Sequence, residues 1–278
     1  MARAGRLRLP KLVATDLDGT IVRSDDTVSA YTRQVMARVR AAGIPVVGAT
    51  GRGPRLLEMS RRDLPAAEYL VLAGGGRVVD LREPDRPVTL FDQRMEGPAV
   101  AALLDDLEAI VGPMLVMVEV QDDPYAPLWG DLDPDWPWPQ RVKPVPRVEA
   151  LSGDVIKAFA RAPGLTSDEL LQIAQQVVSP DKASLTQAGL GFVEICPPGV
   201  DKATGLSLIT EQLGLSPEEV LVFGDMPNDI PMFTWAGWRR VAVANAHPSV
   251  RMLADEITLS NDDHGVAVWL ERMLERAG

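Results

Sequence analysis

Short apolar runs alternate with amphipathic segments along the first third of the chain. The runs at 11–17, 44–50 and 69–76 are rich in branched apolar residues, which is typical of buried strands. The segment 27–43 carries apolar residues at helical spacing and stops on a glycine, and 53–64 follows as a second helix. Repeated strand–helix–strand order implies parallel strands, so this part of the chain predicts an α/β sheet.

The order of elements changes in the middle of the chain and then returns. A helix, two strands, a helix and a strand are predicted at 97–110, 114–120, 154–162, 166–178 and 190–196. The strand–helix alternation of the first third then returns. Strands are predicted at 219–225, 239–246 and 256–260, with helices between them and a last helix at 265–277.

The simplest architecture that fits this order is one sheet interrupted by an insertion. We therefore predict the α/β class, with a doubly wound, mainly parallel, Rossmann-like sheet as a core and an inserted α/β cap domain. The discontinuous core takes residues 1–82 and 196–278, and the cap takes residues 83–195.

The segment 123–151 interrupts the predicted cap with many prolines and tryptophans. Because proline lacks a backbone donor and fixes its own φ, such density predicts a long loop without a regular ladder or helix. Long loops of this kind are often functional. Its tryptophans, Trp129, Trp136 and Trp138, either line a substrate pocket or pack beneath the loop.

Composition narrows the class of protein. Apolar residues make up 46% and charged residues 24%, which is ordinary for a globular chain. No apolar run approaches the length of a membrane span, and the N-terminus lacks the apolar stretch of a secretory signal. The single cysteine, Cys196, excludes an internal disulfide and is expected to be a small buried residue. A soluble, cytoplasmic protein with no membrane partner fits best.

The net charge of −11 argues against a nucleic-acid partner, because a phosphate backbone needs a basic surface. It does not argue against a small anionic ligand. A local group of metal ion, lysine and helix N-termini overrides the overall field at contact distance.

Residues that could take part in chemistry stand at the ends of three predicted strands. The first strand ends on Asp16 and Asp18, the second ends on residues 50–52, and residues 225–229 follow a later strand. Ligands bind outside the carboxyl ends of strands in an open α/β sheet, and residues i and i+2 of an extended chain share one side. Crowded carboxylates are neutralised by a cation, and an oxygen-only site suits Mg²⁺. A carboxylate also serves as a nucleophile toward phosphorus.

Four motifs occur along the chain in this order: "DLDGT" at 16–20, "TGR" at 50–52, Lys202 within "PPGVDKATG", and "GDMPND" at 224–229. Together they resemble the haloacid dehalogenase superfamily, in its Cof-type branch of sugar-phosphatase-like enzymes with a large α/β cap. The resemblance implies the fold predicted above, and it spans nearly all of the core.

The resemblance also implies catalytic roles. Asp16 is then the nucleophile, and Asp18 protonates the leaving oxygen before it activates water. Thr50 and the amide of Gly51 bind phosphate oxygens, and Lys202 offsets the charge on the nucleophile and the phosphoryl group.

The same resemblance implies a Mg²⁺ site. Asp16, the backbone carbonyl of Asp18, and Asp225 are its ligands, with Asp229 close by or behind them. Asn228 helps to orient this group. Arg52 matches a residue that often faces the substrate, although a structural salt bridge explains it equally well, and Asp229 is also a candidate helix cap.

The chain departs from the pattern of that branch at two places. Residues 74–76 are Gly-Gly-Gly where Asn-Gly-Ala is usual, so a side chain that would reach toward the substrate is missing. Ala203 follows Lys202 where glycine is common.

His247 and His264 stand in loops before helices, and we do not expect either to be a general base.

These observations predict a Mg²⁺-dependent phosphomonoester hydrolase. Its partner is a small phosphorylated metabolite such as a sugar phosphate, and the reaction passes through an aspartyl-phosphate. A phosphomutase and a non-catalytic phosphate-binding module are the alternatives on the same fold. The sequence does not predict the oligomeric state.

Overall fold

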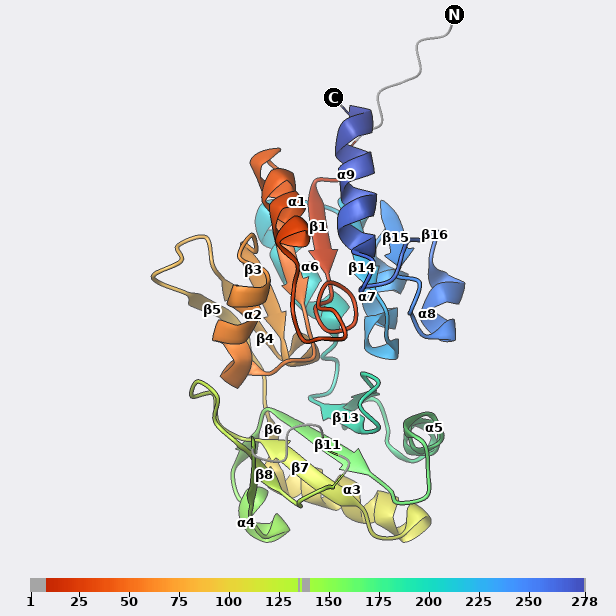
Figure 1. The fold of residues 1–278 in the computed structure, drawn as a ribbon. Helices are drawn as coiled ribbons and strands as arrows, with labels where there is room; N and C mark the ends of the chain where they lie inside the picture. The colour runs from red at the N-terminus through yellow and green to blue at the C-terminus, as the bar shows by residue number, and fades with distance from the viewer. Residues whose placement is uncertain (1–8, 135, 137–140, 278) are drawn as a thin grey trace, which may run out of the picture.

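The computed structural model describes residues 9–134, 136 and 141–277, which form two large sheets, one above the other in Figure 1. The upper, eight-stranded sheet is called the core sheet. Its strands in spatial order are β16 (Glu256–Ile257), β15 (Arg239–Ala242), β14 (Val220–Gly224), β1 (Leu12–Thr15), β2 (Val46–Ala49), β3 (Tyr69–Leu72), β4 (Arg77–Asp80) and β5 (Val88–Asp92). Neighbours from β16 to β3 are parallel, and β4 and β5 are antiparallel. The prediction of a mainly parallel α/β sheet is confirmed.

Helices cover both faces of the core sheet. On one face α1 (Ala30–Ala41) packs beside α9 (Gly265–Ala277), and on the other α6 (Lys202–Leu213) packs beside α7 (Ile230–Trp235) (Figure 1). The remaining helices near this sheet are α2 (Leu57–Asp63) and α8 (Pro248–Leu253). Every residue of β1, β2, β3 and β14 is buried, which explains why these strands are continuous apolar runs rather than alternating ones.

The lower, six-stranded sheet is called the cap sheet. Its strands in spatial order are β12 (Ser184–Thr186), β13 (Val193–Cys196), β11 (Lys157–Arg161), β7 (Leu115–Glu119), β8 (Leu128–Gly130) and β9 (Val142–Pro144). All neighbours are antiparallel except β8 and β9. A short pair, β6 (Met95–Glu96) with β10 (Asp154–Val155), and helices α3 (Gly97–Val111), α4 (Arg147–Ala150) and α5 (Ser167–Val177) accompany it.

The two faces of the cap sheet have different neighbours. Val118, Ala158 and Ile195 belong to the apolar cluster that includes residues of α3 and α5. Side chains of the opposite parity, among them Phe159, form a second cluster on the other face. Alternation along each strand therefore leaves one face for the helices and one face for the core sheet.

The expectation of a long loop without a regular ladder or helix at 123–151 is wrong, because β8, β9 and α4 lie within it. The two strands are only three residues long, so they fit between prolines, and Pro144 ends an edge strand, where a missing donor interrupts no ladder. Trp136 is buried and packs on Phe159 and Phe192, with ring centroids 5.6 and 5.1 Å apart. Trp138 lies outside the described residues.

Sheet membership differs from the predicted boundaries at both ends of the insertion. β5, which lies beyond residue 82, belongs to the core sheet, whereas Cys196 ends a strand of the cap sheet. The predicted third strand at 69–76 ends at Leu72, and a 3₁₀ turn over Ala73–Gly75 follows it. The division into a core and a cap with those boundaries stays a prediction.

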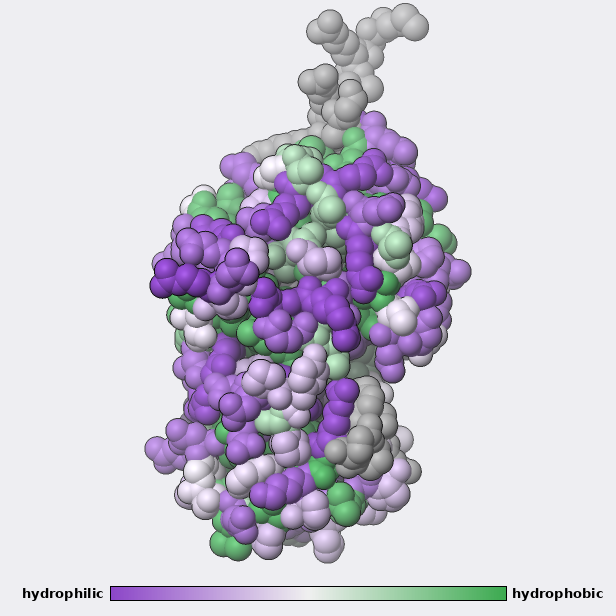
Figure 2. All heavy atoms as spheres, turned by 60° about the vertical axis from the view of Figure 1, so that its left-hand side comes forward, coloured by the Kyte–Doolittle hydropathy of each residue, from purple (hydrophilic) through white to green (hydrophobic). Residues whose placement is uncertain are grey.

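The surface in Figure 2 is mostly hydrophilic, and its apolar residues lie in small groups between polar ones. No helix in the described part of the chain is long and apolar enough to cross a membrane.

Candidate functional site

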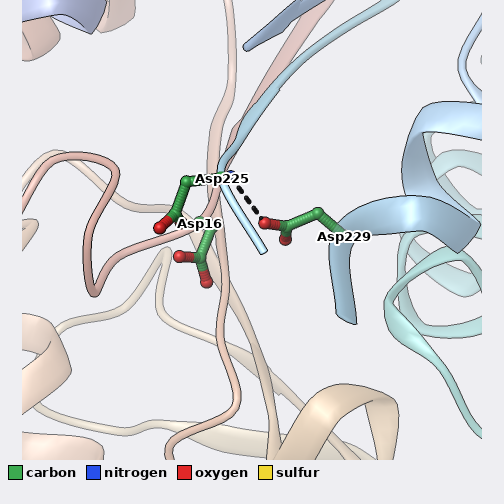
Figure 3. A group of neighbouring side chains, drawn as sticks. All are labelled: Asp16, Asp225 and Asp229. Carbon is green, nitrogen blue, oxygen red and sulfur yellow. Dashed lines mark hydrogen bonds between the residues drawn. The ribbon is translucent and has the colours of Figure 1, made fainter. Parts of the chain in front are cut away.

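Three aspartates meet at the edge of the core sheet where β1 and β14 end. Because these strands are parallel neighbours, Asp16 and Asp225, which follow them, emerge side by side (Figure 3). Asp229, from the turn after β14, completes the group. Carboxylate oxygens of the three lie within 4.8 Å of one another, and all three residues are buried. Such a group is able to bind a metal ion.

Lys202 joins this group from the first turn of α6. The Asp201 side chain accepts a hydrogen bond from the Thr204 amide at 2.8 Å, so the helix begins at Lys202. The Lys202 Nζ donates to Asp16 Oδ1 at 2.6 Å and to Asp229 Oδ1 at 2.5 Å, and its side chain has no exposed surface. A buried ammonium thus stands between two carboxylates.

Burial and crowding change the pKa values of these groups. Burial, opposed by Lys202 and reinforced by Asp229, raises the pKa of Asp16 to about 7. Burial and then the neighbouring Asp16 raise the pKa of Asp225 well above its ordinary value. For Lys202, burial alone lowers the pKa, but the two carboxylates outweigh it and the net shift is upward.

Hydrogen bonds and a close approach of the backbone hold the side chains of Asp225 and Asp229 in place. The Asp229 Oδ2 accepts hydrogen bonds from the amides of Asp225 at 2.8 Å and Met226 at 3.0 Å. The Thr20 hydroxyl donates to Asp225 Oδ1 at 2.7 Å. Gly19 has φ +79°, and a Cβ there would lie 2.3 Å from Asp225 Oδ2, so only glycine fits at this point of the "DLDGT" motif.

Asp18 and Arg52 form an ion pair at the rim of the site. Both Asp18 oxygens accept from the Arg52 guanidinium, at 2.8 and 2.5 Å, while its third nitrogen donates to buried Asp63 at 2.7 Å. The Asp18 side chain is 57% exposed. The salt-bridge alternative for Arg52 is therefore what the structure contains, and its contact with a substrate stays a prediction.

The residues after β2 lie across from the aspartates. Thr50 is buried, and its Oγ1 accepts from the Arg52 amide at 3.1 Å. Gly51 faces Asn228, because a Cβ on Gly51 would lie 3.4 Å from Asn228 Nδ2. The structure thus gathers Asp16, Lys202 and the motif residues at 50–52 and 225–229 at one edge of the sheet.

The sequence interpretation missed three charged residues of the cap sheet that reach the same edge, namely Glu119, Lys157 and Glu194. Lys157 Nζ donates to the Gly51 carbonyl at 2.6 Å and to Glu194 Oε1 at 2.8 Å. Glu119 lies beside Arg55, with Oε2 and Nε 3.5 Å apart. The sequence did contain a signal for them, because each is a charged residue within a predicted strand of the cap whose other residues are mostly apolar.

The two histidines and the cysteine have structural contacts of their own. His247 caps α8 by accepting from the Ser249 amide at 3.3 Å, and the His264 ring packs edge-on against Tyr31. Cys196 is buried, which raises the pKa of its thiol to about 12. The burial of Cys196 agrees with the expectation from the sequence.

A family model described as haloacid dehalogenase-like hydrolase matches residues 13–270. The chain belongs to this family. The resemblance drawn from the four motifs is thereby confirmed. The prediction of a phosphatase agrees with the curated relatives, several of which are named phosphatases.

Known relatives cover the hydrolase almost from end to end. A 5-amino-6-(5-phospho-D-ribitylamino)uracil phosphatase of Bacillus subtilis (strain 168) is 27% identical over 286 residues, covering 95% of this chain and 98% of its own. Among solved structures, a haloacid dehalogenase-like hydrolase from Bacteroides thetaiotaomicron has a TM-score of 0.74 at 24% identity, covering 95% and 99% of the two chains. A sugar phosphatase of subclass IIB of the superfamily has a TM-score of 0.75 at 20% identity, covering 94% and 98%. These two structures share the fold of this hydrolase.

Proposed function

We propose that the hydrolase is a Mg²⁺-dependent phosphomonoesterase that works through an aspartyl-phosphate. The observation that carries this proposal is the placement of Asp16, whose carboxylate lies 2.6 Å from a fully buried lysine and beside two further buried aspartates. A carboxylate held by an ammonium at a strand end is suited to attack a phosphorus atom.

In the first step an Asp16 oxygen forms a bond to phosphorus, and the bond from phosphorus to the ester oxygen breaks. Asp18 gives its proton to that departing oxygen. In the second step Asp18 takes a proton from water, the water oxygen attacks phosphorus, and the bond to Asp16 breaks. The Thr50 hydroxyl and the Gly51 amide hold phosphoryl oxygens, and Lys202 balances their charge.

The donor set fits a small, hard cation. Asp16 and Asp225 offer carboxylate oxygens and Asp18 offers its carbonyl, whereas both Asp229 oxygens already accept hydrogen bonds. When bound there, Mg²⁺ supplies positive charge to the transferring phosphoryl group. Asp229 is then a residue that positions Lys202 and the Asp225 backbone.

A thermal-shift titration tests this site without any turnover. After chelator treatment, added Mg²⁺ is expected to raise Tm by roughly 5 °C at about 100 times Kd, because the ion binds only the folded chain. Asp225→Asn removes one negative ligand and should abolish most of the rise. The exposed Asp105→Asn is the matched control and should keep it. An equal rise in Asp225→Asn would place the ion elsewhere.

The leaving-group dependence tests Asp18. Asp18→Ala should lower kcat/KM for an alkyl phosphate by on the order of 10²- to 10⁴-fold, because the alkoxide needs a proton as it departs. The loss should be at least about tenfold smaller for p-nitrophenyl phosphate, whose leaving group is acidic. Equal losses on both esters would contradict the general-acid role.

A panel of small phosphate esters, scored for phosphate release with and without Mg²⁺, tests the function as a whole. Sugar phosphates belong in it, as does the substrate named for the B. subtilis relative. Release of inorganic phosphate supports the hydrolase, an isomerised sugar phosphate supports a phosphomutase, and inertness toward every ester supports a binding module.

A further inference from the structure

The turn after β2, at residues 50–52, contains two hydrogen-bond donors that find no acceptor among the residues that the structure describes. They are the Gly51 amide and the Thr50 hydroxyl, the donors proposed above to hold phosphoryl oxygens. The Thr50 amide donates to the Val71 carbonyl at 2.8 Å. The carbonyls of Thr50 and Arg52 accept from amides of the 3₁₀ turn after β3, at 3.0 and 2.8 Å. The turn thus has a fixed backbone and two donors left for a ligand.

The peptide group between Gly51 and Arg52 is held at both of its ends. Its N–H donates to Thr50 Oγ1 at 3.1 Å, and its carbonyl accepts from Lys157 Nζ at 2.6 Å. A hydroxyl group has one proton to donate and lone pairs to accept with. Because Thr50 Oγ1 accepts from the Arg52 amide, its own proton points to a different atom. This orientation of the peptide group therefore leaves the hydroxyl proton for a phosphoryl oxygen.

The opposite orientation of the same peptide group would disable the hydroxyl. Glycine has no Cβ, so the peptide group that follows Gly51 rotates more easily than one that follows another residue. Half a turn would bring the Gly51 carbonyl oxygen to the place of the Arg52 N–H, next to Thr50 Oγ1. The hydroxyl would then donate to this carbonyl and not to the phosphate. A donor that holds the carbonyl on the other side prevents this, and Lys157 is that donor.

Lys157 is fixed in place by a second hydrogen bond. It is the first residue of β11 in the cap sheet and is 1% exposed. Its Nζ also donates to Glu194 Oε1 at 2.8 Å, and Glu194 lies on the neighbouring strand β13. The carboxylate balances the charge of the ammonium, which makes both tolerable in a buried place. The ammonium is thus neutralised by its partner and acts on the turn through a directed hydrogen bond.

The cap sheet also contacts the residues that follow the turn. Glu119 of β7 is buried, and a Cβ on Gly53 would lie 2.0 Å from its Oε2, so the backbone packs directly against this carboxylate. The Arg55 amide donates to Glu119 Oε1 at 3.4 Å, and the Tyr125 amide donates to the Arg55 carbonyl at 2.8 Å. The segment 51–55 is therefore held by the cap at several points, and Lys157 reaches the part of it that is proposed to bind phosphate.

We propose that Lys157 is a positioning residue that keeps the Thr50 hydroxyl directed at the phosphoryl group. It holds the Gly51 carbonyl, the same peptide group then keeps the Arg52 amide on Thr50 Oγ1, and the hydroxyl proton is left for a phosphoryl oxygen. Lys157 belongs to the cap sheet, whereas Thr50 follows a strand of the core sheet, so this contact couples docking of the cap to the phosphate donor. This inference rests on the proposed phosphomonoesterase function.

The test is a double-mutant cycle in a Glu194→Gln background, which removes the buried negative charge that loss of the lysine would leave unpaired. Lys157→Met keeps a long side chain and removes the ammonium. With Thr50 present, we expect it to lower kcat/KM for p-nitrophenyl phosphate with Mg²⁺ on the order of 10- to 100-fold. When Thr50→Val is also present, no hydroxyl remains to be oriented, and the same change should cost less than about threefold.

Three controls accompany the cycle. Glu194→Gln alone should stay within about threefold of the wild type, because the amide oxygen still accepts from Lys157 and the contact with Gly51 is kept. Asp122→Asn removes an ion pair of 2.9 Å between the cap and Arg77 of the core sheet, away from the turn. It should lower kcat/KM by less than about threefold, and equally with and without Thr50→Val. The rise in Tm with Mg²⁺ should persist in every variant, because the proposed metal ligands are unchanged.

A loss from Lys157→Met that is equal with and without Thr50→Val would mean that the lysine does not act through the hydroxyl. That result, an unchanged kcat/KM in Lys157→Met, or an unchanged kcat/KM in Thr50→Val overturns the inference while the phosphatase stands. If the wild-type protein with Mg²⁺ hydrolyses neither p-nitrophenyl phosphate nor any ester of the panel, the proposed function fails, and the inference fails with it.

Discussion

Asp16→Asn is expected to lower kcat for p-nitrophenyl phosphate by on the order of 10⁴-fold or more, with the fold intact. Asparagine keeps the size of the side chain but removes the negative charge, and its neutral amide oxygen is a far weaker nucleophile toward phosphorus than a carboxylate. Lys202 keeps its contact with Asp229 at 2.5 Å, so the variant leaves no unpaired ammonium. Steady-state phosphate release and circular dichroism of the same preparation provide the measurement.

The exposed Asp105→Asn on α3 is the matched control, since it makes the same chemical change far from the strand ends. It should retain wild-type turnover. Near-normal hydrolysis by Asp16→Asn would show that another group is the nucleophile. A burst of p-nitrophenol equal to the enzyme concentration, seen in the wild type and absent in the variant, would support the covalent step directly.

Lys202→Met is expected to remove both activity and a large part of the stability. The ammonium has no exposed surface and bridges Asp16 and Asp229, so its loss leaves two buried carboxylates without their counter-ion. Removing one partner of a buried ion pair costs about 3–5 kcal/mol. Urea unfolding of chelator-treated protein should show this as a lower midpoint with an unchanged slope.

Lys182→Met is the control for this variant, because Lys182 is 63% exposed and its ion pair with Asp106 spans 4.0 Å. Exposed pairs of this kind contribute roughly 0–1 kcal/mol, so its unfolding midpoint should stay close to the wild-type value. A stable but inactive Lys202→Met would mean that the lysine serves the reaction without holding the site together.

The apolar pattern was sufficient to predict the core sheet and the edge where the chemistry lies. The runs that became β1, β2 and β14 are buried at every position, so they had to be continuous and apolar, and parallel pairing then brings their ends together. A hydrophilic pair such as Asp16 and Asp18 at the end of such a run is visible in the sequence alone.

The pattern was weaker where elements are short or exposed. The strand β5 at Val88–Asp92 is largely exposed, so it carries no continuous apolar signal, and the three-residue strands between the prolines are too short to show a period. These strands form because neighbouring strands offer them partners. Local composition alone favoured a loop there.

The sequence by itself therefore determined the fold class, the family and the carboxylates at the strand ends, because each of these depends on a few neighbouring residues. Only the tertiary structure decided which partner each charge has. Lys157, Glu194 and Gly51 are far apart in the chain, and their contact depends on the register of β11 against β13 and on how the cap sheet faces the core sheet. Register and packing are properties of long-range pairing, which no local pattern specifies.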